Sequence, residues 1–113
     1  MELDLTYLNE MAGEDGNLRL EMISIFEEQS REYSERMHHC LTSKDWQELA
    51  HYAHKAKPSA AVVGLVQIAQ ELNLLESLAI QGREEYRYRE IVEKYDKECK
   101  KAAEQLRKMF ESV

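Results

Sequence analysis

The stretch YREIVEKYDKECKKAAEQLRKM, residues 88–109, decides the fold class. Apolar side chains recur along it at alternating steps of four and three residues, the seam of a helix packed along most of its length in a bundle. The seam positions are Tyr88, Val92, Tyr95, Cys99, Ala102, Leu106 and Met109. The spacing predicts a long amphipathic helix at this end of the chain.

Other stripes with the same periodicity precede this seam. They predict a long helix over about residues 15–41, a third helix from Trp46 to Ala60, and a fourth from Leu65 to Leu78 that ends near Gly82. The inward stripe of the long helix is Leu18, Met22, Ile25, Phe26, Gln29, Tyr33, Met37, Cys40 and Leu41. A short helix around Leu5 and Leu8, ending at Gly13, is expected before it. Ser43 and Asp45 are both N-cap candidates for the third helix.

The connections between these segments are short, so neighbouring helices should be antiparallel. We therefore predict an all-α fold, an up-and-down antiparallel four-helix bundle with a short additional N-terminal helix over one end. A chain of 113 residues suits one domain, residues 1–113. Met1 and the long final helix favour a complete protein over a piece of a hybrid kinase.

Charge and composition exclude several classes. A formal net charge of −7 disfavours general nucleic-acid binding, which depends on Lys and Arg neutralising phosphates. No apolar run approaches the roughly 20 residues needed to cross a bilayer, and Met1 is followed by acidic residues, so a cytoplasmic protein is expected. Cys40 and Cys99 lie on core stripes without CxxC spacing, which favours reduced, packed thiols over a disulfide or a metal site.

The acids are unevenly distributed. No Asp or Glu occurs from Leu49 through Gln70, whereas His51, His54, Lys55 and Lys57 all lie there. Burial of this helix accounts for part of the bias, and the rest is typical of a surface that keeps repulsion away from an anion.

His54 and Lys57 are the central pair in this window. Residues three apart on a helix are surface neighbours, so the ammonium can reach a group attached to the ring. His54 lies one residue from the buried stripe position Ala53, which places it towards solvent beside the core. An exposed, unprotonated imidazole can accept a phosphoryl group, and cations beside it neutralise the phosphoryl oxygens. No carboxylate cluster and no Gly-rich nucleotide loop is expected beside His54, so most of the transfer machinery should come from a partner.

The order of His54, Lys57 and Gly64 resembles the signature of histidine-containing phosphotransfer (HPt) domains. Similar residues occur in the opening segment 4–16, in the Lys44–Trp46 turn and at the pair Leu75–Glu76, so the resemblance covers about residues 4–80. It implies that His54 is the phosphoacceptor, Lys57 its charge partner and Gly64 a small residue at the end of the active helix.

The resemblance also implies the partners. These are response-regulator receiver domains, or a hybrid sensor histidine kinase, that carry phosphate on an aspartate and bind Mg²⁺ themselves. The chain would then be a monomeric phosphoryl carrier without its own cofactor or metal, rather than an enzyme. The surface that meets the partner is predicted to include His51, Lys55, Pro58, Ser59 and Gly64.

Pro58 departs from the family pattern, which usually has Gly directly after the Lys. Proline lacks the N–H that would bond to the carbonyl of His54, so we predict a bend, or a carbonyl satisfied by water, at the acceptor residue. The proline ring also adds bulk where a partner approaches, which could alter docking.

Three other interpretations of the sequence can be compared with this one. A helical adaptor could bind a receiver domain without chemistry. A sensor-kinase dimerisation fragment could also carry an acceptor histidine, although an acidic residue usually follows that histidine and Lys55 occupies the position here. A zinc site is disfavoured, because His51 and His54, or His38 and His39, offer only pairs where three or four ligands must converge.

Overall fold

The computed structural model describes residues 3–111, and these residues form helices and connecting turns without a strand. The helices are α1 (Thr6–Ala12), α2 (Gly16–Ser43), α3 (Trp46–Val62), α4 (Val66–Gln81), the short 3₁₀ helix η1 (Glu85–Arg87) and α5 (Tyr88–Glu111). The predicted all-α class is confirmed.

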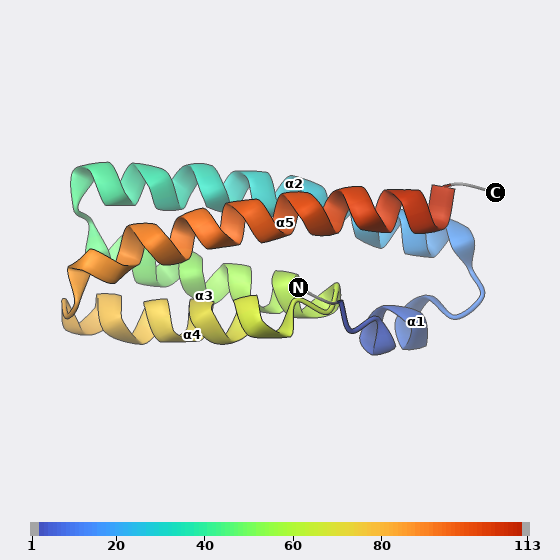
Figure 1. Ribbon diagram of the computed structural model, residues 1–113, viewed down its shortest axis with the longest axis horizontal. Coiled ribbons are helices and arrows are strands. Elements are labelled where there is room, and N and C mark those ends of the chain that lie inside the picture. Colours follow the sequence, from blue (N-terminus) through green and yellow to red (C-terminus); the bar gives the residue numbers. More distant parts are fainter. Residues whose placement is uncertain (1–2, 112–113) are drawn as a thin grey trace.

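The four long helices lie side by side, and consecutive helices run in opposite directions along the molecule (Figure 1). Helix α2 contacts α3 and α5, and α4 contacts the same two helices, with the most extensive contact between α3 and α4. The molecule is elongated, with principal extents of 46 × 20 × 20 Å. Among the described residues, no helix combines the length and apolarity that crossing a bilayer requires.

Helices α2 and α5 are longer than the two helices between them. At 1.5 Å per residue the 28 residues of α2 span about 42 Å and the 17 residues of α3 about 25 Å. The long pair therefore continues past the end of α3 and α4, and α1 lies in the step that this leaves (Figure 1). Leu8 and Ala12 of α1 are buried there, so the predicted short helix does cover one end.

Side-chain caps fix where the helices begin. The Asp15 carboxylate accepts from the Leu18 N–H at 3.0 Å and starts α2. Of the two candidates for α3, Asp45 is the cap, accepting from the Glu48 N–H at 3.1 Å. Ser43 is instead the last residue of α2.

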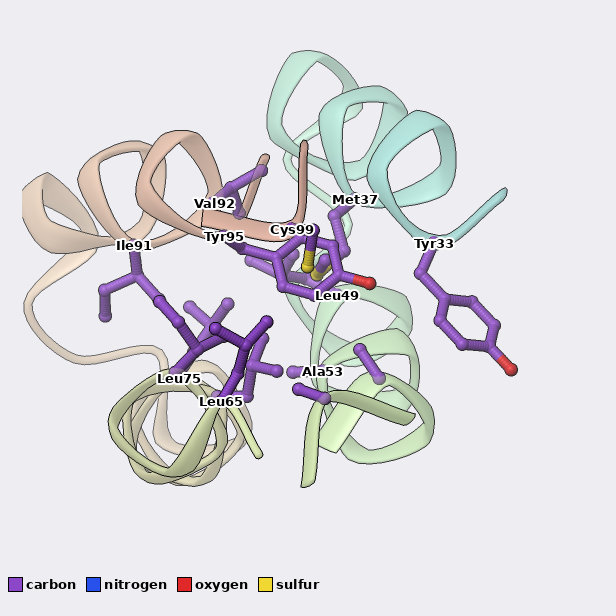
Figure 2. Close-up of a cluster of buried hydrophobic side chains, with 14 of the residues drawn as sticks. Tyr33, Met37, Leu49, Ala53, Leu65, Leu75, Ile91, Val92, Tyr95 and Cys99 are labelled. Carbon is purple, nitrogen blue, oxygen red and sulfur yellow. The ribbon is translucent and has the colours of Figure 1, made fainter. Parts of the chain in front are cut away.

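All four long helices contribute buried side chains to one hydrophobic core. Figure 2 shows Met37, Leu49, Leu75 and Tyr95 pointing into the space between the four helices, and all four are at most 1 % exposed. Three predicted core positions are wrong: Leu18, Ile25 and Met109 are 37 %, 46 % and 48 % exposed. Ile25 precedes the buried Phe26 by one residue, so it lies about 100° around the helix, on the flank of the stripe.

Both cysteines are buried and free, as predicted. Burial raises the pKa of the Cys40 thiol to about 11 and that of the Cys99 thiol to about 12. Burial likewise raises the pKa of Tyr95. The thiols therefore act as small apolar core groups.

The N-terminal segment at Asp4 is hydrogen-bonded to the turn between α3 and α4. The Asp4 N–H donates to the Gly64 carbonyl at 3.1 Å, and Gly64 has a φ of +81°. A Cβ atom at position 64 would overlap the Asp4 backbone. Glycine is needed here both for the left-handed conformation and for this close approach.

Candidate phosphoacceptor site

His54 lies on the outer flank of α3, and its side chain is 63 % exposed. Its helix neighbours Ala53 and Ala56 are completely buried. The small alanines let α3 pack closely on the core while the imidazole stays at the surface. The predicted exposure of the ring is confirmed.

Glu76 of α4 holds one edge of this ring. The His54 Nδ1 atom lies 3.1 Å from each carboxylate oxygen of Glu76. An ionised carboxylate can only accept hydrogen bonds, so the contact selects the imidazole form with its hydrogen on Nδ1. The other nitrogen, Nε2, then carries the free lone pair on a largely exposed ring.

Lys57 shares this carboxylate and has a second partner. Its Nζ atom lies 3.8 Å from a Glu76 oxygen and donates to the Asn73 Oδ1 atom at 3.0 Å. Lys57 is one helical turn from His54, and Asn73 is one turn from Glu76. The His54–Glu76 and Lys57–Asn73 contacts therefore join α3 to α4, and together they hold an imidazole beside an ammonium.

Three of the other predicted surface residues lie on the exposed face of α3. His51, Lys55 and Pro58 are all exposed. The His51 ring meets the Tyr52 ring edge-on, with centroids 5.2 Å apart, and the Lys55 ammonium lies 5.9 Å from the centre of the Tyr52 ring. Lys55 makes no ion pair within residues 3–111, so its charge adds to the positive potential of the site.

Ser59 and Gly64 do not belong to that exposed face. Ser59 is 9 % exposed and its hydroxyl oxygen is buried without a hydrogen-bond partner. Gly64 is buried beneath the N-terminal segment, two residues beyond the end of α3. Neither presents a side chain to a docking protein, because both positions face the interior of the fold rather than the surface around His54.

Helix α3 is assigned without interruption through Pro58 to Val62. The proline ring is exposed on the same face as Lys55. The bend or water-satisfied carbonyl at His54 stays a prediction.

Sequence reasoning did not assign a role to Glu76 or Asn73. Both act across a helix pair, and periodicity within one helix carries no information about its neighbour. A usable signal was present, since His54 and Glu76 lie at similar distances along the chain on either side of the Gly64 turn. An antiparallel hairpin brings such positions together.

No group of three or more His, Cys, Asp or Glu side chains within residues 3–111 could hold a metal ion. His38 instead contacts Asp96 at 2.5 Å across α2 and α5.

A groove also opens between α2 and α5, lined by residues such as Arg31, Cys99 and Glu104, but none of the predicted site residues lines it.

Comparison with known protein families identifies the family of the chain. The family model described as the Hpt domain matches residues 21–113, which is most of the chain. No curated protein and no solved structure matches the chain. The chain therefore belongs to the Hpt-domain family, whose members are phosphoryl carriers in two-component phosphorelays.

Proposed function

We propose that this chain accepts a phosphoryl group on Nε2 of His54 from the phosphoaspartate of a receiver domain and passes it to the aspartate of another receiver. The observation that carries the proposal is the pairing of a 63 % exposed imidazole with a carboxylate 3.1 Å from its Nδ1 atom. That arrangement leaves Nε2 as the nitrogen that an incoming protein can reach. The circuit of contacts among α2, α3, α4 and α5 supports the up-and-down four-helix bundle as the scaffold.

The transfer step needs only a nucleophile and charge neutralisation from this chain. The Nε2 lone pair attacks phosphorus, the bond from phosphorus to the aspartyl oxygen breaks, and the carboxylate of the receiver leaves with its electron pair. Positive charge develops on the ring, and the Nδ1–H···Glu76 hydrogen bond stabilises it. The reverse sequence delivers the group to the second receiver.

Lys57 and Lys55 supply positive charge for the phosphoryl oxygens. Lys57 is held at the His54–Glu76 pair, and Lys55 is exposed on the adjacent face. The acid-free run from Leu49 through Gln70 keeps other carboxylates of α3 and early α4 away from the phosphoryl group. This distribution supports an anionic transferring group.

The receiver should supply the remaining apparatus. We expect it to bring the Mg²⁺ ion and the phosphorylated aspartate, while this chain contributes no metal or cofactor. We also propose that the carrier acts as a monomer in the cytoplasm, where it would exchange with several receivers in turn.

The test is phosphoryl transfer from receiver domains of the source organism. Each purified receiver, charged with acetyl phosphate and Mg²⁺, is mixed with the full chain, and acid-labile phosphate on the chain is measured. The variants are His54→Gln and, as a control at an exposed histidine on α2, His39→Gln. We expect at least one receiver to label the wild-type protein and His39→Gln, and none to label His54→Gln.

Two outcomes would overturn the proposal. Labelling that persists in His54→Gln would place the acceptor elsewhere. Failure of every receiver to label the wild-type protein, while one of them still binds it, would support the adaptor without chemistry.

A further inference from the structure

Lys57 makes its shorter contact with a neutral group. Its Nζ atom is 3.0 Å from the amide oxygen of Asn73 but 3.8 Å from the nearest oxygen of Glu76. An amide oxygen orients an ammonium through a hydrogen bond but cannot cancel its charge. Lys57 is therefore oriented mainly by a neutral amide, while Glu76 contributes a longer ion pair.

The neighbouring charges show why a neutral residue at position 73 matters for the charge balance around Lys57. Glu76 is already engaged with Nδ1 of His54 at 3.1 Å, so one carboxylate serves both the ring and the ammonium. Lys55 adds a second cation on the same helix. A carboxylate at position 73 would give Lys57 a second ion pair and would balance the two cations with two anions.

Restraint of Lys57 also has value in itself. A lysine side chain loses rotamer entropy when it is fixed. In this structure Asn73 takes up part of that ordering before a phosphoryl group arrives, since Lys57 is only 33 % exposed and hydrogen-bonded at rest.

We propose that Asn73 is a positioning residue that holds the Lys57 ammonium beside His54 without neutralising it, and thereby prolongs the lifetime of the phosphorylated ring. This inference rests on the proposed function. In hydrolysis, water adds its oxygen to phosphorus, the bond from phosphorus to Nε2 breaks, the imidazole leaves with that electron pair, and a proton of the water passes to solvent. The ammonium slows that step, because its attraction for the phosphoryl oxygens is strongest while the group is held on His54.

The experiment measures the decay of phosphorylated His54 without any partner. The full chain is charged with phosphoramidate, a chemical phosphoryl donor to imidazoles, and His54 is followed by ³¹P and ¹H–¹⁵N NMR after the donor is removed. The variants are Asn73→Asp, which adds a carboxylate at Lys57, and Asn73→Gln, which keeps an amide. Gln67→Asp adds the same charge at an exposed site on α4 more than one turn away.

From the strength of a charge pair near a protein surface, we expect Asn73→Asp to shorten the half-life about fivefold, with Asn73→Gln and Gln67→Asp within about twofold of wild type. An unchanged half-life in Asn73→Asp would overturn the inference, as would an equal loss in Gln67→Asp. Because no receiver takes part, failure of the proposed transfer partners would be seen separately, in the receiver experiment.

Discussion

Gly64→Ala should destabilise this protein more than Gly82→Ala, although both glycines have a positive φ. Gly64 has a φ of +81° and Gly82 a φ of +62°. A Cβ atom at Gly82 meets nothing within 4 Å, whereas at Gly64 it would overlap the backbone of Asp4. The comparison therefore separates the cost of the left-handed conformation from the cost of displacing the N-terminal segment.

The magnitudes follow from these two terms. The left-handed conformation costs alanine about 1 kcal/mol more than glycine, so Gly82→Ala should lose about that much stability. Gly64→Ala loses this too, together with about 2 kcal/mol for overpacking and for the Asp4 N–H bond to the Gly64 carbonyl. For a domain of this size, the expected falls in Tm are about 4 °C and about 12 °C.

The assay is urea unfolding followed by circular dichroism, with a second pair of proteins that lack residues 1–4. Deleting the segment removes the collision but not the requirement for a positive φ. In the shortened chain, Gly64→Ala should therefore cost about 1 kcal/mol, and the coupling energy of the cycle should be about 2 kcal/mol. The cost of the deletion itself cancels in the cycle.

Two results would refute this reasoning. One is an equal loss of stability for Gly64→Ala and Gly82→Ala in the full chain. The other is a loss for Gly64→Ala that is unchanged when residues 1–4 are absent. Either would mean that the N-terminal segment does not press on the turn in solution.

Three further predictions concern the site, the core and a helix end. Glu76→Ala removes the group that selects the imidazole form with its hydrogen on Nδ1. Phosphoramidate should then give a mixture of Nδ1 and Nε2 phosphohistidine by ³¹P NMR, where the wild-type protein gives Nε2. A pure Nε2 product from the variant would count against the role of Glu76. Because burial raises the thiol pKa values to about 11 and about 12, Cys40 and Cys99 should resist iodoacetamide at pH 8 and react fully in urea, and rapid native alkylation of both would contradict their burial. Asp45→Ala should cost about 1 kcal/mol in urea unfolding and Asp45→Asn much less, since asparagine can still cap α3; equal losses would rule out the cap.

Much of the fold could be predicted because each helix carries its own period and its own end signals. The α5 seam at Tyr88, Val92 and Tyr95 is buried as predicted. Gly13 caps the end of α1, and the Asp15 side chain caps the start of α2. These features depend on residues within a few positions of one another.

The errors in the core arise where packing depends on distant segments. Leu18 lies near the start of α2 and Met109 near the end of α5. These are the ends of the two long helices that extend past α3 and α4 in Figure 1. A stripe on such an overhang has fewer neighbours to cover it, and α1 is the helix that lies at that end in Figure 1. Periodicity correctly assigned these residues to helices, but it could not show which of their faces would be covered.

The same distinction applies to the site. The predicted pair His54 and Lys57 lies within one turn of α3, and its exposure follows from the neighbouring alanines. Glu76 and Asn73 come from α4 and depend on the register between two helices, which no local pattern sets. Ser59 was expected at the surface from its sequence position, yet it lies on the buried side of α3.

The register of α3 against α4 links the Gly64 turn to the chemistry at His54. His54 pairs with Glu76, and one turn further along α3 Lys57 pairs with Asn73, so both contacts depend on the same alignment of the hairpin. A slip of one residue would rotate each partner by about 100° and break both contacts at once. The turn that sets this alignment is held by the hydrogen bond from Asp4 to Gly64. We therefore expect the segment at Asp4 to influence the site through helix register.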